Sequence, residues 1–414
     1  MNGLALVRPL EEDWRDALDG VARSRGWPSS RDPAKLAARV VELSAAYNDP
    51  ARARAAMREA GAARLGFSFA RDVPKAAAAV RELLAAGALP FDRPLRVLDL
   101  GAGLGASTWG LARALKAAGA TAGLDVTWVD NDGEALDLGA AILRARAGGA
   151  DAVEIRLRAR AASLASASAL GRFDVVLLGQ VLSELDVGSP GEARLARHVE
   201  LIRSLLRDRC ADEGPGGAVV VIEPALRERA RHLHRVRDAL AATGVPVFAP
   251  CLHSDACPAL AREGDWCHED LEVDLPAWLW PVARAAGLRR EGLSFSYLVL
   301  HRAGRRLVDA LASPSAPGPA RLRVVSEEIR TKGKREAFVC GECASPAGPV
   351  AARARLMRLD RDANAGNAAW EELKRGDLVL VTPPPERERP RIGSASTVEK
   401  AIIVSTGAGG AESR

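Results

Sequence analysis

Short apolar runs alternate with segments of helical spacing from residue 94 onward, and this alternation limits the possible folds more than any other feature of the chain. The helix-like segments cover residues 107–119 and 134–146. The strand-like runs cover residues 95–100, 124–130, 152–157, 173–179 and 218–223. Strands that alternate with helices pair in parallel, and the helices cover both faces of the sheet. The sequence therefore predicts an α/β core with a parallel sheet.

Other patterns flank this core. Residues 1–90 read as helical, with apolar residues at helical spacing in 34–43 and 75–87. A helix at 225–240 and strands at 245–249 and 294–301 should complete the core, which we place at 91–311.

A change of composition marks the end of the core. Ala312–Pro319 is rich in proline, serine and alanine, which is typical of a linker. Beyond it, strand-like runs are short, at 321–326, 336–340 and 377–381. We therefore expect a small β domain over 320–383, and a flexible tail over the polar segment 384–414.

The first strand of the core ends in a glycine-rich turn, D-L-G-A-G-L-G, which contains Asp99, Gly101, Gly103 and Gly105. Glycine tolerates positive φ and lets the backbone approach a ligand closely. The second strand ends in Asp130, where a carboxylate could accept hydrogen bonds from both hydroxyls of a ribose.

This turn does not match the nicotinamide fingerprint G-x-G-x-x-G. It resembles the S-adenosylmethionine loop of class I (Rossmann-like) methyltransferases, in which Asp99 would face the amino group of the methionine moiety. Another nucleotide, or a tight turn with no ligand, is the alternative.

The end of the fourth strand is where substrate chemistry would be expected. It reads G-Q-V-L-S-E-L, so Gln180, Ser183 and Glu184 could line a pocket. Neither an N-P-P-Y type motif nor a nucleophilic cysteine follows this strand. We name no catalytic residue, and whether the chain is an enzyme stays open.

Three of the six cysteines, Cys251, Cys257 and Cys267, fall in one loop at 250–270. Thiolates are natural ligands of zinc and of iron–sulfur clusters. The spacing is wider than the C-x2–4-C of zinc knuckles, and it is not the C-x3-C-x2-C of radical S-adenosylmethionine enzymes. A fourth ligand could be Cys340 or Cys343, with His253 and His268 as alternatives, or the cysteines could be ordinary buried thiols.

Four stretches together resemble a known family. They are F-A-R-D-V-P-K-A-A-A-A-V-R-E-L-L (69–84), V-L-D-L-G-A-G-L-G-A-S-T-W-G (97–110), L-L-G-Q-V-L-S-E-L (177–185) and D-W-C-H (265–268). Over about residues 40–345 the chain is similar to the methyltransferase-like small-ribosomal-subunit assembly factors of mitochondria and their bacterial relatives. The resemblance implies a [4Fe-4S] cluster held by Cys251, Cys257, Cys267 and Cys340, and association with the small ribosomal subunit and its rRNA.

The charge of the chain permits a nucleic-acid partner without requiring one. The formal net charge is +5 and the pI is about 9.0. Basic clusters, each as easily read as a solvated surface, occur at Arg227, Arg231 and Arg235, at Arg302, Arg305 and Arg306, and at Lys332, Lys334 and Arg335. Aromatic residues make up only 4%, so we expect backbone and shape recognition of RNA, and no DNA partner.

Sequence features also bear on location. Acidic residues near the start argue against a secretory or transit signal, and no apolar run is long enough for a membrane span. We expect a reducing cytoplasm, where cysteines are thiols or metal ligands.

The expected function is therefore a small-subunit assembly protein that binds S-adenosylmethionine and a [4Fe-4S] cluster. An active rRNA methyltransferase is one alternative, and a zinc-stabilised small-molecule methyltransferase is another.

Overall fold

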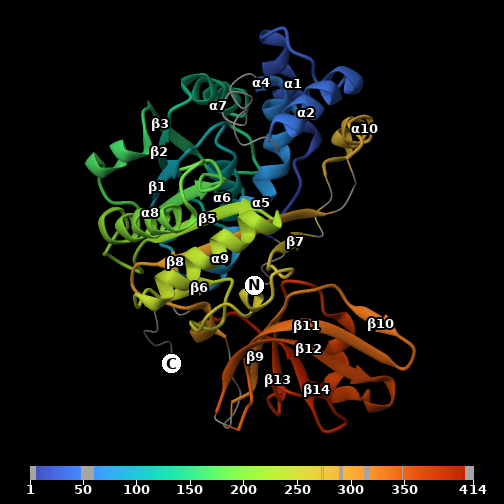
Figure 1. Cartoon of the computed structure of the whole chain (residues 1–414). Helices are drawn as coiled ribbons and strands as arrows, with labels where there is room; N and C mark the ends of the chain where they lie inside the picture. The colour runs from blue at the N-terminus through green and yellow to red at the C-terminus, as the bar shows by residue number, and fades with distance from the viewer. Residues whose placement is uncertain are drawn as a thin grey trace, which may run out of the picture.

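The computed structural model describes residues 6–47, 60–271, 273, 275–288, 292–311, 318–346 and 348–405. Within these ranges the strands form one sheet of eight strands and a second sheet of seven. Figure 1 shows the first sheet among helices in the upper part of the molecule, and the second sheet below it. Most of the expected linker, 312–317, lies outside the described residues, as do 1–5 and 48–59 of the N-terminal region.

The first sheet confirms the predicted parallel core. Its strand order is β3-β2-β1-β4-β5-β8-β6, with β7 paired to β8. Strands β1 to β5 pair in parallel, whereas β8 is antiparallel to β5, β6 and β7. The bounds are β1 (Leu95–Leu100), β2 (Leu124–Asp130), β3 (Ile155–Ala161), β4 (Val175–Gly179), β5 (Ala218–Pro224), β6 (Val247–Ala249), β7 (Glu269–Leu271) and β8 (Leu293–His301).

Strand β3 begins later than the predicted 152–157. The backbone N–H of Val153 donates to the carbonyl of Ala112 in the neighbouring helix, so this residue lies outside the sheet ladder. Strands β4 and β5 are buried on both faces, as expected for central parallel strands.

Helices cover both faces of this sheet. The longer ones are α5 (Phe69–Ala85), α6 (Ala106–Ala117), α7 (Gly133–Ala145), α8 (Gly191–Ser204) and α9 (Arg227–Ala242). The side chain of Asp132 caps α7 by accepting a hydrogen bond from the N–H of Ala135. The described helices are all too short or too polar to cross a membrane.

The N-terminal region is helical, as predicted, in its described part. It contains α1 (Glu12–Ser24), α2 (Pro33–Tyr47), α4 (Gly61–Ala63) and a π-helical turn η2 (Arg64–Ser68) that continues into α5. Trp14 packs against both Phe69 and Trp109, so this region is continuous with the core. Helix α10 (Trp280–Ala285) joins the same apolar cluster through Val282 and Ala283.

Short helical turns complete the chain. They are η3 (Leu164–Ala169), η4 (Leu205–Arg209), η5 (Pro258–Ala261), η6 (Ala277–Leu279), η7 (Leu307–Ala310), η8 (Asp360–Asp362) and η9 (Ala365–Glu372).

The second sheet has the order β14-β12-β11-β9-β13-β15, with β10 paired to β11. Its strands are β9 (Ala320–Val324), β10 (Ile329–Thr331), β11 (Lys334–Cys343), β12 (Val350–Leu359), β13 (Leu378–Thr382), β14 (Arg391–Ile392) and β15 (Thr397–Lys400). The flexible tail expected over 384–414 is therefore wrong as far as Lys400. Ile392 and Val398 are buried in the apolar cluster of this sheet, which holds the last two strands in place; residues 406–414 lie outside the described part.

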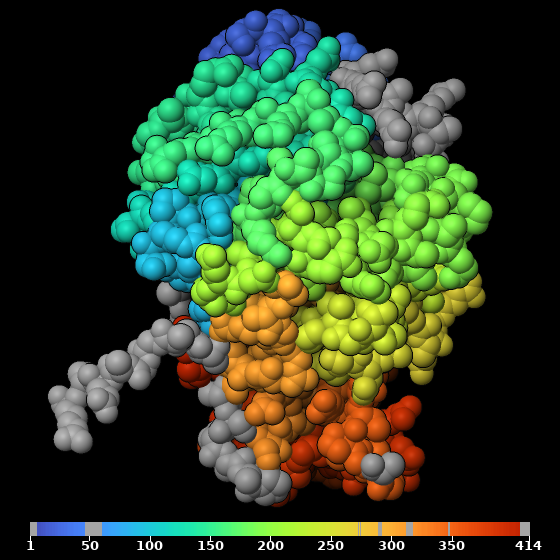
Figure 2. Space-filling view, turned by 90° about the vertical axis from the view of Figure 1, so that its left-hand side faces the viewer, coloured from blue at the N-terminus to red at the C-terminus, as the bar shows by residue number. Residues whose placement is uncertain are grey.

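A buried group of charges joins the two sheets. Arg323 of β9 pairs with Glu82 of α5 at 2.7 Å, and Arg81 of α5 pairs with Glu269 of β7 at 2.7 Å. The hydroxyl of Tyr297 in β8 donates to Glu82 at 3.1 Å. In Figure 2 the orange-red and red atoms of the second sheet lie directly below the green and yellow atoms of the core.

Candidate functional site

A cavity of about 640 Å³ lies at the carboxyl ends of β1, β2 and β4. Four of the six predicted cofactor-binding residues line it: Gly101, Gly103, Asp130 and Gln180. They come from three different strand ends, which the parallel sheet brings to one edge.

The backbone of the glycine turn requires glycine at these positions. Gly101 has φ +66° and Gly103 has φ +52°, in the left-handed region. A Cβ at Gly101 would lie 2.6 Å from a methyl carbon of Val181. The N–H of Gly103 donates to one oxygen of Asp130 at 2.8 Å, and the N–H of Asp132 donates to the other at 2.9 Å. The Asp130 carboxylate is thus held in place by backbone groups.

Asp99 and Gly105 do not line this cavity. Asp99 is 1% exposed, and its Oδ2 accepts a hydrogen bond from the hydroxyl of Thr108, which in turn accepts one from the indole of Trp128. Gly105, with φ +79°, begins α6 where a Cβ would lie 2.2 Å from the Trp128 ring. Both residues lie behind the turn and support it. Asp99, which was expected to contact a ligand, therefore does not reach the cavity.

Burial makes Asp99 sensitive to pH. Burial raises its pKa from 3.8 to about 7, against the lowering effect of the Thr108 hydrogen bond. A raised carboxyl pKa means that the folded state favours the protonated form, so the contribution to stability is present below pH 3.8 and is lost as the pH rises to about 7.

We therefore expect the free energy of unfolding to fall more steeply between pH 4 and 7 in the wild type than in Asp99→Asn. The difference should reach at most about 4 kcal/mol, at about 1.4 kcal/mol per pKa unit. Urea unfolding at a series of pH values measures it. Parallel pH profiles for the two proteins would contradict this reading.

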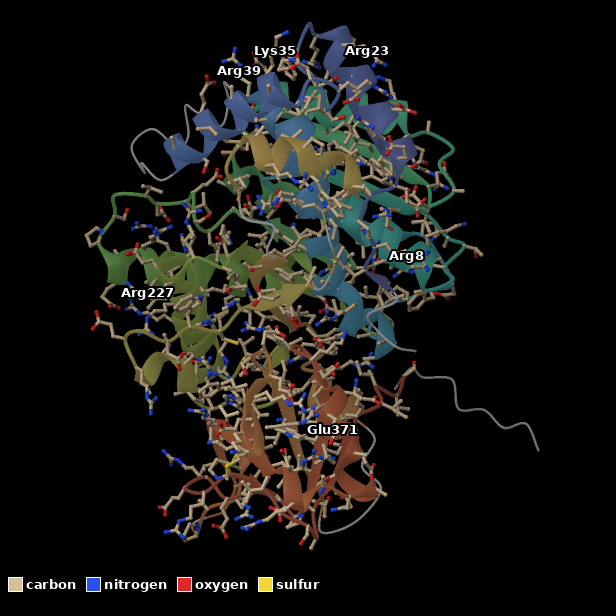
Figure 3. The ribbon with its side chains drawn as sticks, turned by 90° about the vertical axis from the view of Figure 1, so that its right-hand side faces the viewer. Arg8, Arg23, Lys35, Arg39, Arg227 and Glu371 are labelled. Carbon is tan, nitrogen blue, oxygen red and sulfur yellow. The ribbon has the colours of Figure 1, made fainter. Side chains whose placement is uncertain are left out.

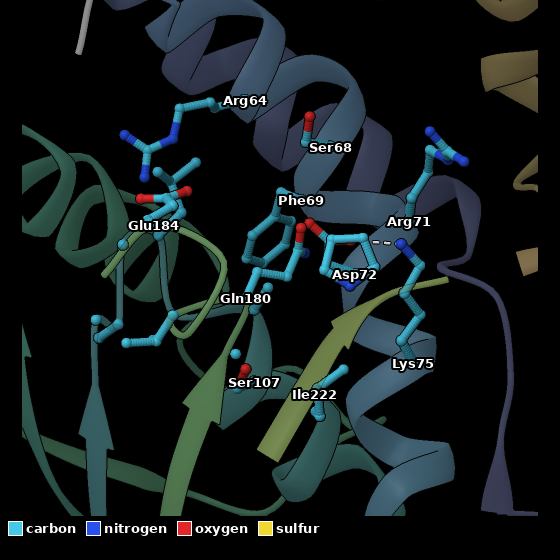
Figure 4. Close-up of a pocket in the computed structure, with 18 of the residues that line it drawn as sticks. Arg64, Ser68, Phe69, Arg71, Asp72, Lys75, Ser107, Gln180, Glu184 and Ile222 are labelled. Carbon is cyan, nitrogen blue, oxygen red and sulfur yellow. Dashed lines mark hydrogen bonds and ion pairs between the residues drawn. The ribbon is translucent and has the colours of Figure 1, made fainter. Parts of the chain in front are cut away.

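The opposite wall of the cavity comes from η2 and α5, which sequence reasoning assigned only as helical. Figure 4 shows Arg64, Phe69, Arg71, Asp72 and Lys75 on this wall, with Phe69 beside Gln180 and Arg71 pointing away from it. Arg64 pairs with Asp132 at 3.0 Å, and Lys75 pairs with Asp72 at 2.9 Å. The available signal was Lys75 placed three residues after Asp72 and four after Arg71, a spacing that brings its side chain near both on an otherwise alanine-rich stretch of helix.

A second, buried cavity lies where the cysteine loop meets the second sheet. Cys251, Cys257, Cys267 and Cys340 all line it. Cys343 is 1% exposed and belongs instead to the apolar cluster of the second sheet. Among the residues that the structure describes, no three His, Cys, Asp or Glu side chains form a group that could hold a single metal ion.

Three of these cysteines, Cys257, Cys267 and Cys340, lie in an environment that disfavours their thiolate forms. Burial raises the pKa of Cys257 to about 12 and that of Cys267 to about 11, and burial also raises the pKa of Cys340 well above its usual value. The next cause in each case is the neighbouring Cys251. The sulfurs are therefore close enough to repel one another as anions, and a bound cationic group would reverse this effect.

Helix α9 holds the cysteine loop in place. The carboxylate of Asp238 accepts the N–H of Cys257 at 2.9 Å, and His234 Nε2 accepts the N–H of Cys267 at 3.0 Å. Arg231 donates to the carbonyls of Arg262 and Asp265 at 2.7 and 2.6 Å. The expected basic stripe on this helix is therefore partly wrong, because Arg231 supports the loop; Arg235 also pairs with Glu192.

Comparison with solved structures gives low overall similarity to several methyltransferases. The magnesium protoporphyrin IX methyltransferase of Synechocystis with bound S-adenosylmethionine is 15% identical, covering 56% of this chain and 80% of that chain, with a TM-score of 0.32. A putative RNA methyltransferase from Pyrococcus horikoshii is 16% identical over 55% and 82%, with a TM-score of 0.31. A ribosomal protein L11 methylase from Lactobacillus delbrueckii subsp. bulgaricus is 16% identical over 54% and 77%, with a TM-score of 0.28.

The core is an α/β fold built on a parallel sheet, and a second, curled sheet follows it. No curated protein matches the chain. The family model described as mitochondrial small ribosomal subunit Rsm22 matches residues 66–374. This range includes the glycine turn and Asp130 of the first cavity and the four cysteines of the second. The chain therefore belongs to the Rsm22 family.

Proposed function

We propose that this chain is a small-ribosomal-subunit assembly protein that binds S-adenosylmethionine in the first cavity and a [4Fe-4S] cluster in the second. The observation that carries the proposal is the convergence of four cysteines, from the loop of the core and from the second sheet, on one buried cavity. The cluster would join the two sheets, and the joined sheets would present one surface to rRNA.

The first cavity suits S-adenosylmethionine in size and in polarity. A volume of about 640 Å³ is within the usual range for small-molecule sites. The Asp130 carboxylate has lone pairs left after its two backbone hydrogen bonds, and these could accept ribose hydroxyls. The turn at Gly101 and Gly103 keeps side chains away from the ligand.

The second cavity suits a multi-iron cluster better than one zinc ion. A structural zinc ion needs four donors gathered tightly around one centre. The described side chains form no such group, although four thiols surround the cavity. In a [4Fe-4S] cluster each thiolate binds a different iron, so the ligands lie farther apart. The cluster, when bound, would supply the positive iron centres that stabilise the thiolates.

An active rRNA methyltransferase is the second candidate. Gln180, at the end of β4, adopts φ +61°, which is uncommon for a residue other than glycine, and such backbone strain is often found at functional sites. Glu184 lines the same cavity. Loss of one methylated rRNA nucleotide in a deletion strain, restored by the wild type and not by Asp130→Ala, would support this candidate.

The rRNA surface would include exposed basic side chains. Figure 3 shows Arg23, Lys35 and Arg39 on the N-terminal helices, far from Glu371 of the turn η9. The family description names the mitochondrial small subunit, and a cytoplasmic location of this chain remains a prediction.

Asp130→Ala should weaken S-adenosylmethionine binding at least about tenfold, because charged hydrogen bonds contribute roughly 1.5–3 kcal/mol each. Isothermal titration calorimetry on the full chain measures the affinity. Asp125→Ala is the matched control, because this carboxylate is on the same strand but exposed, away from the cavity. Equal losses in both variants would argue against the assigned ribose contact.

Cys257→Ala should strongly reduce co-sedimentation of the anaerobically purified protein with small-subunit particles, because the second sheet would keep its ion pairs to the core but lose the proposed cluster. Cys210→Ala is the control, since Cys210 is buried beside β4 and does not line the second cavity. Unchanged co-sedimentation of Cys257→Ala, with its iron lost, would count against the proposed role of the cluster.

A further inference from the structure

A histidine lies among the four cysteines of the second cavity. His253 is 3% exposed and follows Cys251 in the loop of the core. Its ring Nε2 is 3.7 Å from the Sγ of Cys340, which belongs to the second sheet. Its ring Nδ1 is 3.5 Å from a terminal nitrogen of Arg237. The imidazole therefore bridges an arginine of α9 and a cysteine of β11.

The arginine determines which ring nitrogen carries the proton. A guanidinium is always charged in proteins, and its nitrogens only donate hydrogen bonds. We therefore assign the Nδ1 that faces Arg237 as the acceptor, which places the proton of the neutral ring on Nε2. Arg237 is itself held in place by Asp238 at 2.8 Å and by the backbone carbonyl of His253. These contacts orient the Nε2–H group of His253 toward the sulfur of Cys340.

A thiolate that is bound to iron can only accept a hydrogen bond. We infer that His253 is a positioning residue, not a ligand: it donates from Nε2 to the Cys340 sulfur and thereby raises the reduction potential of the cluster. This inference rests on the proposed cluster. Hydrogen bonds to cluster sulfurs withdraw electron density and stabilise the reduced form, and they are among the main factors that set the potential. The bond also tethers the loop of the core to the second sheet.

The test is the midpoint potential of the one-electron couple, measured by dithionite titration of the anaerobic full chain with electron paramagnetic resonance detection. His253→Leu removes the donor and should shift the midpoint to more negative values with the iron content unchanged. His253→Gln keeps an N–H donor and should restore most of the wild-type potential. His232→Gln, a histidine that does not line the cavity, should leave the potential unchanged.

A measurement on the wild type covers the case in which His253→Leu fails to fold. With ¹⁵N-histidine labelling, electron spin echo experiments on the reduced cluster should show a weak nitrogen coupling, transmitted through the hydrogen bond. A strong coupling, or loss of iron in a folded His253→Leu, would make His253 a ligand and overturn the inference. An unchanged potential in His253→Leu would also overturn it. Wild-type protein without iron would instead refute the proposed function itself.

Discussion

Arg323→Met should lower the free energy of unfolding by about 3–5 kcal/mol, the usual cost of removing one partner from a buried ion pair. Arg323 is 5% exposed, and its guanidinium lies 2.7 Å from Glu82. It also donates to the carbonyls of Pro250 at 2.8 Å and Gly376 at 3.2 Å. Methionine fills much of the same volume but leaves the Glu82 carboxylate buried beside Tyr297 without its cation.

Urea unfolding of metal-free protein, followed by circular dichroism, measures this effect without a contribution from a bound cluster. Arg330→Met is the control, because Arg330 is exposed on β10 and its replacement should change the free energy by less than about 0.5 kcal/mol. The double variant Arg323→Met/Glu82→Leu should recover much of the loss, since no unpaired charge then stays buried. A double variant as unstable as the single one would show that the charge pair is not the cause.

The parallel core could be predicted from the sequence because most residues of its strands β1, β2, β4 and β5 are buried. Leu95–Leu100 and Leu124–Asp130 are short apolar runs, and the structure places strands with those bounds. The second sheet was only partly predicted. Strand β12 alternates small or apolar residues with arginines, a pattern that is typical of a half-buried strand but that does not stand out in an arginine-rich chain.

The last strands lacked any local signal. β14 has only two residues, and β15 is mostly polar, with Val398 alone buried. Their place in the sheet depends on pairing with β12 and β13, which composition does not reveal. This is why a polar segment was expected to be flexible and instead supplies the two edge strands of the sheet.

The candidate sites were also predicted only in part. Local motifs identified the glycine turn and Asp130. The wall formed by Arg64 and α5 was missed, because it reaches the cavity only through the packing of α5 on the core. Asp99 belongs to the motif, but it supports the glycine turn and does not line the cavity. Its carboxylate is held beneath the turn by Thr108, which is itself hydrogen-bonded to Trp128.

Strand geometry places Cys340 and Cys343 in different surroundings. The sequence predicted a strand that ended at Cys340, but β11 continues to Cys343. Residues three apart on a strand point to opposite faces of the sheet. Cys340 therefore faces the second cavity, whereas Cys343 faces the apolar cluster of its own sheet.

Cys340→Ala and Cys343→Ala make a matched pair for the cluster. The wild type, purified without oxygen, should carry about four irons per chain. Cys340→Ala should lose most of this iron and its visible absorption, because one corner of the cluster would have no thiolate. Cys343→Ala should keep both, since its sulfur does not line the cavity. Alanine is preferred to serine in both variants, because a serine oxygen could itself bind iron.

The loss of iron should lower the free energy of unfolding of Cys340→Ala, whereas Cys343→Ala should keep the stability that iron provides. Binding to the folded state alone adds stability, so Cys340→Ala should fall close to the metal-free wild type in urea unfolding. Cys343→Ala should show only the cost of a small cavity in the second sheet, with or without iron. If Cys343→Ala lost the cluster and Cys340→Ala kept it, Cys343 would be the fourth ligand and Cys340 would not. The hydrogen bond from His253 to Cys340 would then have no effect on the cluster.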